Sequence, residues 1–292
     1  MFESPVDPAD PEIQHLRFSP SQLDVWDRCP RKGYYIYRQG YKNQSSSPAM
    51  RKGTVIHKIL EVYYSDNLEL IEIAGMIEDM FPLYDDQIVA YEVMGLMTRY
   101  SGYYASKDAL FHVLAVERNL CVPFTTPAGR TVYLNGIVDL IGETENGKLF
   151  VMDHKSTSRV FWNKDSVYFD RQLHIYMAML YLMGYDPRIG VINNINTGLK
   201  NLNVPAEKLF TRVVVDVDEQ KVTRYLQDIG QRIDQVLSYT DYPRVLNKTC
   251  SECTFKEACS LTLQGVDETE YLESNFREQV RPIQIDIDLG KD

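Results

Sequence analysis

Two acidic residues and a lysine near the middle of the chain have the types and spacing of a metal-dependent hydrolytic site. Asp153 and Lys155 lie in the run LFVMDHKST, which predicts a strand, so their side chains point to one face and His154 points to the other. Asp139 lies in the preceding predicted strand, across a turn at residues 145–148, so antiparallel pairing brings it close to Asp153. Two carboxylates can share a divalent cation, and the ammonium can orient or help deprotonate the attacking water.

His57 is the candidate imidazole ligand for this cation. Mg2+ or Mn2+ prefers oxygen ligands, so two carboxylates, a backbone carbonyl and one imidazole are sufficient. His57 lies in a predicted amphipathic helix over residues 53–64, where a lone histidine is more often structural. Glu117, in the predicted strand VLAVERNLCVPF, is either a further acid of the site or an ordinary strand-face glutamate.

Gln172 and Tyr176 are four residues apart in a helix predicted over residues 170–183, so they are neighbours on one helix face. They could contact a DNA phosphate or brace Lys155. A helix that simply packs with Tyr176 in the core is the alternative.

The five cysteines are a second set of residues that could bind a metal or take part in redox chemistry. Cys250, Cys253 and Cys259 lie close together, and Cys29 is a candidate fourth partner more than two hundred residues earlier. In an intracellular protein, C-x2-C favours metal or redox chemistry over disulfides, and four thiolates could hold an iron-sulfur cluster or a zinc ion. Such a site would clamp the two ends of the chain. Cys121 lies in an apolar predicted strand and is expected to be a buried core thiol.

The charge distribution gives mixed indications about nucleic acid. The chain of 292 residues has a net charge of -10, which argues against a surface coated in phosphate-binding groups. Residues 28–58 contain eight basic residues and no acid. The interleaved tyrosines are Tyr34, Tyr35, Tyr37 and Tyr41. This segment could track phosphates and stack bases, or be a solvated helical face with core tyrosines.

The order of predicted elements indicates an α/β fold. Ser19-Pro20-Ser21-Gln22 is a capping box that starts a helix, and helical patterns continue to about residue 106. A three-strand meander, a helix, two further strands and a long helix follow, which predicts a mixed central sheet flanked by helices. There is no apolar run near 18 residues and no signal peptide pattern, so we expect a soluble, cytoplasmic protein without a membrane partner.

Taken together, six motifs resemble those of the RecB-like branch of the PD-(D/E)XK nucleases, which includes AddB C-terminal domains and CRISPR-associated RecB-like exonucleases. FSPSQLDVWDRCPRKGYYIY resembles the opening segment of the family, with its first cluster cysteine at Cys29. GTVIHKILE resembles the motif of the metal-binding histidine, here His57. YPRVLNKTCSECTFKEACS resembles the terminal cysteine motif, and the resemblance covers about residues 18–260.

The other three motifs carry the residues of the hydrolytic site. NGIVDLI supplies the first metal-binding aspartate, Asp139, and VMDHKS supplies the D-x-K pair of Asp153 and Lys155. RQLHIYMAMLY resembles the Q-x3-Y motif, with Gln172 and Tyr176. All six motifs occur in the family's order.

The resemblance implies a restriction-endonuclease-like core and a Mg2+- or Mn2+-dependent DNA exonuclease, acting on single-stranded ends in recombination, repair or processing with a possible helicase partner. It implies that a 4Fe-4S cluster is held by Cys29, Cys250, Cys253 and Cys259. It implies that the metal ion is held by His57, Asp139 and Asp153, with the backbone carbonyl of His154 facing it. The remaining alternatives are a noncatalytic DNA-binding or adaptor protein and a zinc-stapled binding module.

With this resemblance, the chain divides into six predicted segments. They are a flexible lead (1–17), an N-terminal helical segment (18–64), a helical insert (65–110), a nuclease core (111–239), an iron-sulfur motif (240–262) and an acidic tail (263–292).

Overall fold

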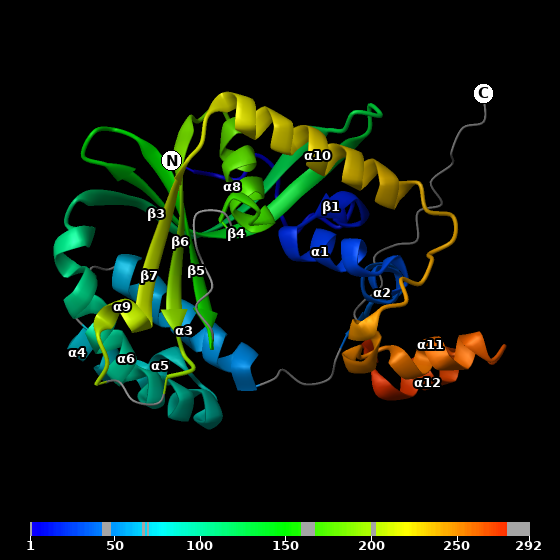
Figure 1. Ribbon diagram of the computed structural model, residues 1–292, viewed down its shortest axis with the longest axis horizontal. Helices are drawn as coiled ribbons and strands as arrows, with labels where there is room; N and C mark the ends of the chain where they lie inside the picture. Colours follow the sequence, from blue (N-terminus) through cyan, green and yellow to red (C-terminus); the bar gives the residue numbers. More distant parts are fainter. Residues whose placement is uncertain are drawn as a thin grey trace. The chain divides into compact units, whose positions relative to one another are not determined.

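A computed structural model describes residues 2–42, 48–65, 68, 70–158, 167–199 and 203–278, which fall into two compact units (Figure 1). The first unit comprises Met1–Pro5, Ser47–Val122 and Gly136–Leu226, and the second comprises Val6–Ser46, Pro123–Asn135 and Gln227–Asp292. Strands β3 (Phe111–Thr125) and β4 (Thr131–Thr144) and helix α10 (Glu219–Leu237) contribute residues to both units. The last part of the predicted acidic tail, residues 279–292, lies outside the described residues.

A mixed sheet forms the centre of the first unit. Strands β4, β5 (Leu149–Thr157), β6 (Pro187–Asn196) and β7 (Phe210–Asp216) are neighbours in that order, and β3 pairs with β4. β4 runs antiparallel to β5, β5 runs parallel to β6, and β6 runs antiparallel to β7. The turn between β4 and β5 contains Gly147, whose φ of 73° suits a residue without a side chain. The predicted meander and the two later strands are therefore present.

Helices cover both faces of this sheet. A shared core joins one face to α3 (Pro48–Ser65), α4 (Leu70–Gly75), α5 (Ile77–Met80) and α6 (Tyr84–Asp108). Helix α8 (Arg171–Leu182) packs on the other face, where a Cβ on Gly190 would lie 2.7 Å from Leu173. A short helix, α9 (Ala206–Leu209), precedes β7. The predicted α/β class with a helix-flanked mixed sheet is confirmed. Among the described helices, none combines the length and the apolar character of a membrane span.

Local capping fixes the start of the helices in the second unit. α1 (Pro20–Arg28) begins after Ser19, whose Oγ accepts a hydrogen bond from the backbone N of Gln22 at 3.2 Å. α2 (Pro30–Gly33) follows and continues as a π-helical turn over Tyr34–Arg38. α1 therefore begins where the capping box predicts it.

A small core in the second unit joins residues from the two ends of the sequence. Its fully enclosed members are Tyr35, Tyr41, Phe255, Ala258, Leu272 and Phe276. The short strands β2 (Tyr41–Lys42) and β8 (Arg277–Glu278) pair antiparallel, and β1 (Arg17–Phe18) pairs in parallel with the start of β4. The C-terminal residues of this core lie in or beside α11 (Lys256–Leu263) and α12 (Thr269–Asn275).

The tyrosines of the basic segment are largely packing residues. Tyr35 and Tyr41 are 0% and 4% exposed. Tyr34 stacks on Tyr242, with ring centroids 4.5 Å apart. The interpretation of these rings as a base-stacking surface is therefore wrong for Tyr35 and Tyr41, because the small core encloses them.

The contact between Gly33 and Trp26 makes the fold sensitive to one added methyl group. A Cβ on Gly33 would lie 2.3 Å from Cε3 of the buried Trp26, although its φ of -58° and ψ of -42° suit alanine. We expect Gly33→Ala to lower the free energy of unfolding by about 1–3 kcal/mol through overpacking. The matched control is Gly102→Ala in α6, where nothing lies within 4 Å of the new Cβ. It should raise the free energy of unfolding by about 0.5–1 kcal/mol. Denaturant titration measures both, and equal effects would contradict this packing.

Candidate metal site

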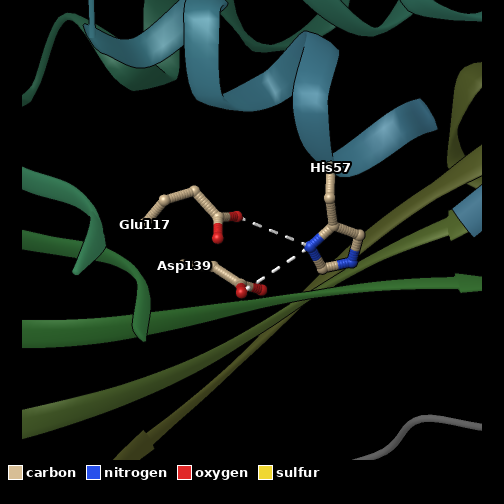
Figure 2. Close-up of side chains that lie close together, drawn as sticks. All are labelled: His57, Glu117 and Asp139. Carbon is tan, nitrogen blue, oxygen red and sulfur yellow. Dashed lines mark ion pairs between the residues drawn. The ribbon is translucent and has the colours of Figure 1, made fainter. Parts of the chain in front are cut away.

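Three side chains from three elements of the first unit converge as a group that could hold a metal ion (Figure 2). His57 comes from α3, Glu117 from β3 and Asp139 from β4, and one ligand atom of each lies within 4.8 Å of the others. Nδ1 of His57 lies 3.6 Å from Oδ1 of Asp139 and 3.8 Å from Oε1 of Glu117. One imidazole and two carboxylates suit Mn2+ or Mg2+. The structure thus brings together two predicted ligands and adds Glu117, whose role the sequence leaves open.

Glu117 has an unusual backbone conformation. Its φ of 45° is the one positive value at a non-glycine residue in the described part of the chain. A left-handed conformation costs roughly 1–2 kcal/mol for a residue with a Cβ, and such strain is concentrated at functional sites. In Figure 2 the carboxylate of Glu117 points toward His57. The strain therefore coincides with a side chain directed into the metal-binding group.

Asp153 and Lys155 form an ion pair close to this group. Asp153 is fully buried, and its Oδ2 lies 2.7 Å from Nζ of Lys155. Among the described residues, Oδ1 of Asp153 has no hydrogen-bond partner, and the ammonium that pairs with Oδ2 also donates to Gln172. Buried polar atoms normally have partners, so the unpartnered Oδ1 fits a site that receives a cation. The ligand role of Asp153 stays a prediction, since it lies outside the group of three.

Gln172 and Tyr176 approach Lys155 from α8. Nζ of Lys155 donates to Oε1 of Gln172 at 2.6 Å, and Nε2 of Gln172 donates to Oη of Tyr176 at 2.8 Å. The ring of Tyr176 packs on Gly136, where a Cβ would lie 2.6 Å from Cε1. These contacts are those of a brace for the lysine. A role in contacting DNA phosphate stays a prediction.

Burial and mutual contacts shift the protonation of the site. Burial lowers the pKa of His57, but the adjoining carboxylates of Asp139 and Glu117 outweigh this effect and raise that pKa to about 10. Burial opposes the ionisation of Asp139, but His57 outweighs it and lowers the pKa of Asp139. Burial raises the pKa of Asp153 to about 7 against the opposing ammonium of Lys155. The cationic side chains of His57 and Lys155 therefore offset the negative charge of the carboxylates in this site.

The side chain of His154 lies outside this group of ligands. Its ring is buried, stacks on Tyr64 with centroids 5.7 Å apart, and places Nδ1 2.8 Å from Nδ2 of Asn193. Burial lowers the pKa of His154 to about 3, so the ring is neutral. Its backbone N–H reaches the site and donates to Oδ2 of Asp139 at 2.6 Å. The metal contact expected through its backbone carbonyl stays a prediction.

In the second unit, the four cysteines expected to bind a cluster line one cavity of about 620 Å³. These free thiols are Cys29, Cys250, Cys253 and Cys259. The same cavity is lined by the cations of Arg28, Lys32, Arg244 and Lys256. Burial raises the pKa of the Cys259 thiol despite the neighbouring Arg244 guanidinium. The set of four thiols with surrounding positive charge fits an anionic thiolate centre, while Cys121 is buried as predicted.

The sequence reasoning missed a set of polar residues next to His154. They are Tyr64, Tyr100, Asp108, Asn193 and Arg212. Four of these residues lie far apart in sequence and resemble ordinary core or surface positions. The exception is Asn193, which the sequence places beside Asn194 in the apolar strand VINNIN. Buried amides in such a strand require specific hydrogen-bond partners, so this pair is a signal that could have been read from the sequence.

Comparison with known proteins gives a family match. The sequence model of the PD-(D/E)XK nuclease superfamily matches residues 17–260. No curated protein matches the chain significantly. A solved structure from Eubacterium rectale, provisionally described as an exonuclease, is 14% identical with a TM-score of 0.48, and the match covers 86% of this chain and 93% of that one. The structure of SSO0001 is 16% identical with a TM-score of 0.36, and the match covers 84% and 85%.

Metal binding at this site should release protons. His57 has a pKa of about 10 and Asp153 of about 7, so an incoming divalent ion must displace protons from both in mildly acidic solution. Affinity for Mn2+ should therefore rise with pH. Between about pH 7.5 and 8.5 the proton on His57 alone gives a rise of about tenfold per pH unit. Below about pH 7 the rise should be steeper, because the proton on Asp153 must also leave.

Calorimetry in buffers of different ionisation enthalpy measures this proton release directly. His57→Gln should lower the number of protons released on Mn2+ binding by one. Lys148→Ala, at an exposed turn, should leave that number unchanged. A wild-type affinity that does not vary with pH would contradict the assignment of these groups.

Proposed function

Because this chain belongs to the PD-(D/E)XK nuclease superfamily, we propose that it is a metal-dependent DNA exonuclease that hydrolyses single-stranded ends in recombination, repair or processing. The observation that carries the proposal is the convergence of His57, Glu117 and Asp139 close to the ion pair of Asp153 and Lys155. The order of the RecB-like motifs supports the exonuclease class. The sequence given contains no P-loop, so we expect any unwinding of a duplex to be weak or done by a partner such as a helicase.

The side chains of the site would have two roles in the reaction, metal binding and positioning of the attacking water. His57, Glu117, Asp139 and Asp153 would hold Mg2+ or Mn2+, which when bound polarises a phosphate oxygen and lowers the pKa of a coordinated water. The ammonium of Lys155, held by α8, would orient the attacking water and stabilise charge that develops on the phosphate. The water oxygen forms a bond to phosphorus and releases a proton to solvent, the bond from phosphorus to the leaving sugar oxygen breaks, and that oxygen takes up a proton from solvent.

A noncatalytic DNA-binding or adaptor protein is the alternative from a different class. Such a protein could keep the fold while losing the site. The intact D-x-K pair, the buried Oδ1 of Asp153 without a partner among the described residues, and the hydrogen bond from Lys155 to Gln172 favour the enzyme. They have no evident use in a protein that only binds DNA.

We further propose that the four cysteines of the second unit hold a 4Fe-4S cluster. Four thiolates that line one cavity can hold either a zinc ion or a cluster. The resemblance of the segment around Cys250, Cys253 and Cys259 to the terminal cysteine motif of the RecB-like nucleases favours the cluster. The cluster would tie Cys29 to the C-terminal helices and so act as a clamp.

Loss of the lysine should abolish DNA degradation. We expect Lys155→Ala and Asp153→Ala to reduce the rate by at least about a hundredfold, because each removes a group that acts on the reacting atoms. The assay is a time course with end-labelled single- and double-stranded DNA and Mg2+ or Mn2+. It also gives the strand preference and the direction of digestion.

The matched control for this experiment is Lys148→Ala, which removes an exposed lysine from the turn between the same two strands. It should digest DNA at the wild-type rate. Lys155→Ala protein that is folded and digests DNA as fast as Lys148→Ala would refute the proposed mechanism.

The cluster proposal predicts colour and metal content. Protein purified without oxygen should be brown and contain about four iron atoms per chain. Cys250→Ala should lose the iron and the visible absorbance, whereas Cys121→Ala, which removes the thiol outside the quartet, should keep both. Elemental analysis and absorbance spectra measure the outcome. A colourless protein with one zinc per chain would overturn the iron-sulfur assignment.

A further inference from the structure

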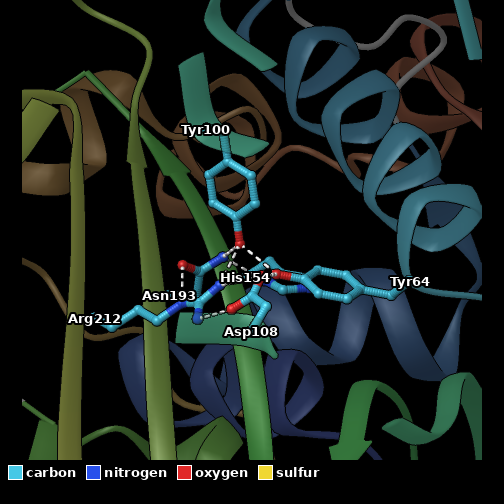
Figure 3. Close-up of polar contacts among 6 residues, drawn as sticks. All are labelled: Tyr64, Tyr100, Asp108, His154, Asn193 and Arg212. Carbon is cyan, nitrogen blue, oxygen red and sulfur yellow. Dashed lines mark hydrogen bonds and ion pairs between the residues drawn. The ribbon is translucent and has the colours of Figure 1, made fainter. Parts of the chain in front are cut away.

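A buried polar network surrounds His154 in the first unit (Figure 3). The Arg212 network consists of Tyr64, Tyr100, Asp108, Asn193 and Arg212. Side chains of the ion pair between Asp108 and Arg212 are only 12% exposed. Desolvation of such a pair can cancel its Coulomb attraction, so the pair is weak evidence of added stability. A role other than stability therefore has to be considered.

Arg212 is held by partners around its guanidinium. Nη2 donates to the hydroxyls of Tyr64 at 2.8 Å and Tyr100 at 2.9 Å, and both Nη atoms bond to the carboxylate of Asp108. Nε donates to Oδ1 of Asn193 at 3.1 Å. The planar guanidinium presents its donors in a fixed arrangement. It therefore fixes which end of the Asn193 amide carries the oxygen.

This orientation of Asn193 determines how His154 is bonded. Because Oδ1 faces Arg212, Nδ2 donates to Oη of Tyr100 at 2.8 Å and to Nδ1 of His154 at 2.8 Å. Nδ1 of the neutral ring is then the acceptor, and Nε2 carries the proton. Nε2 of His154 is buried, and no residue in the described ranges is its hydrogen-bond partner. Among the described residues, Asn193 is therefore the contact that sets the tautomer of His154 and holds Nδ1 of its ring in place.

His154 links this network to the metal-binding carboxylate of Asp139. Its backbone N–H donates to Oδ2 of Asp139 at 2.6 Å. Oδ1, the other oxygen of the same carboxylate, lies 3.6 Å from Nδ1 of His57. Fixing His154 therefore fixes which oxygen of Asp139 is left for a cation.

We propose that Asn193, oriented by Arg212, is a positioning residue for the metal site. It anchors His154 so that the backbone of this residue holds Asp139 in the orientation that offers Oδ1 to a divalent ion. The inference rests on the proposed function in taking His57, Glu117 and Asp139 as the metal ligands. Contacts of this kind around ligating side chains typically alter metal affinity by about 10- to 100-fold.

The decisive comparison is between two buried asparagines of β6. Asn193→Leu removes the donor to His154 and keeps the branching and the number of side-chain heavy atoms. The control, Asn196→Leu, removes a buried asparagine that bonds instead to the backbone of Lys208 and Gly198. Calorimetric titration with Mn2+, without DNA, should give an affinity about 10- to 100-fold weaker for Asn193→Leu and within about twofold of wild type for Asn196→Leu. Thermal unfolding of both variants shows whether stability changes account for the result.

Nitrogen NMR of the imidazole rings gives a readout independent of activity. Wild-type His154 should have an unprotonated Nδ1 and a protonated Nε2, and Asn193→Leu should show a mixture of tautomers. Folded Asn193→Leu protein with wild-type Mn2+ affinity, or with an unchanged His154 tautomer, would overturn the proposal. A purely structural network predicts wild-type Mn2+ affinity for folded Asn193→Leu protein.

A second variant covers the case in which Asn193→Leu does not fold. The double substitution Arg212→Met with Asp108→Leu removes the buried ion pair without leaving either charge unpaired. It should weaken Mn2+ binding in the same direction, and unchanged affinity would again count against the proposal. Wild-type protein that binds Mn2+ but leaves DNA intact would refute the nuclease function alone, because the positioning test uses metal affinity.

Discussion

The antiparallel pairing of β4 with β5 is the constraint on which the candidate metal site depends. The register places Leu140 opposite Met152, and the site residues begin one position beyond this pair. There the carboxylate of Asp139 accepts the backbone N–H of His154, so a side chain is anchored directly to the neighbouring strand. Because side chains alternate along a strand, a register shift of one residue would move Asp153 to the wrong face.

Because side chains alternate along β5, the candidate catalytic residues point to one face of the sheet and the residues that support them point to the other. Asp153 and Lys155 are directed to the face covered by α8, where Gln172 holds the ammonium. Met152 belongs to the core shared with α3 and α6, and His154 meets Asn193 on that same face. The two sets of contacts act on adjacent residues of one short strand. Rigid support on one face can thus control the position of groups on the other.

Local sequence signals were sufficient for much of the fold and for part of the site. The Ser19 cap, the meander and the pairing of Asp139 with the D-x-K strand depend on neighbours in sequence or on one tight turn, so they could be predicted. Convergence of Glu117 with His57 could not be predicted, because it depends on where a third strand and a helix meet. A tyrosine pattern such as that of Tyr35 and Tyr41 fits both base stacking and core packing, since burial depends on distant partners.

The charge balance around Asp153 explains why Lys155 needs a brace. Lys155 neutralises the buried Asp153, at a separation of 2.7 Å. Any cation that binds Asp153 competes with the ammonium for the same carboxylate and repels it, and the low dielectric of a buried site strengthens that repulsion. The hydrogen bond from Lys155 to Gln172 involves no negative charge and so does not depend on Asp153 being free. Gln172, itself bonded to Tyr176, is therefore the contact able to keep the ammonium in place once the carboxylate has another partner.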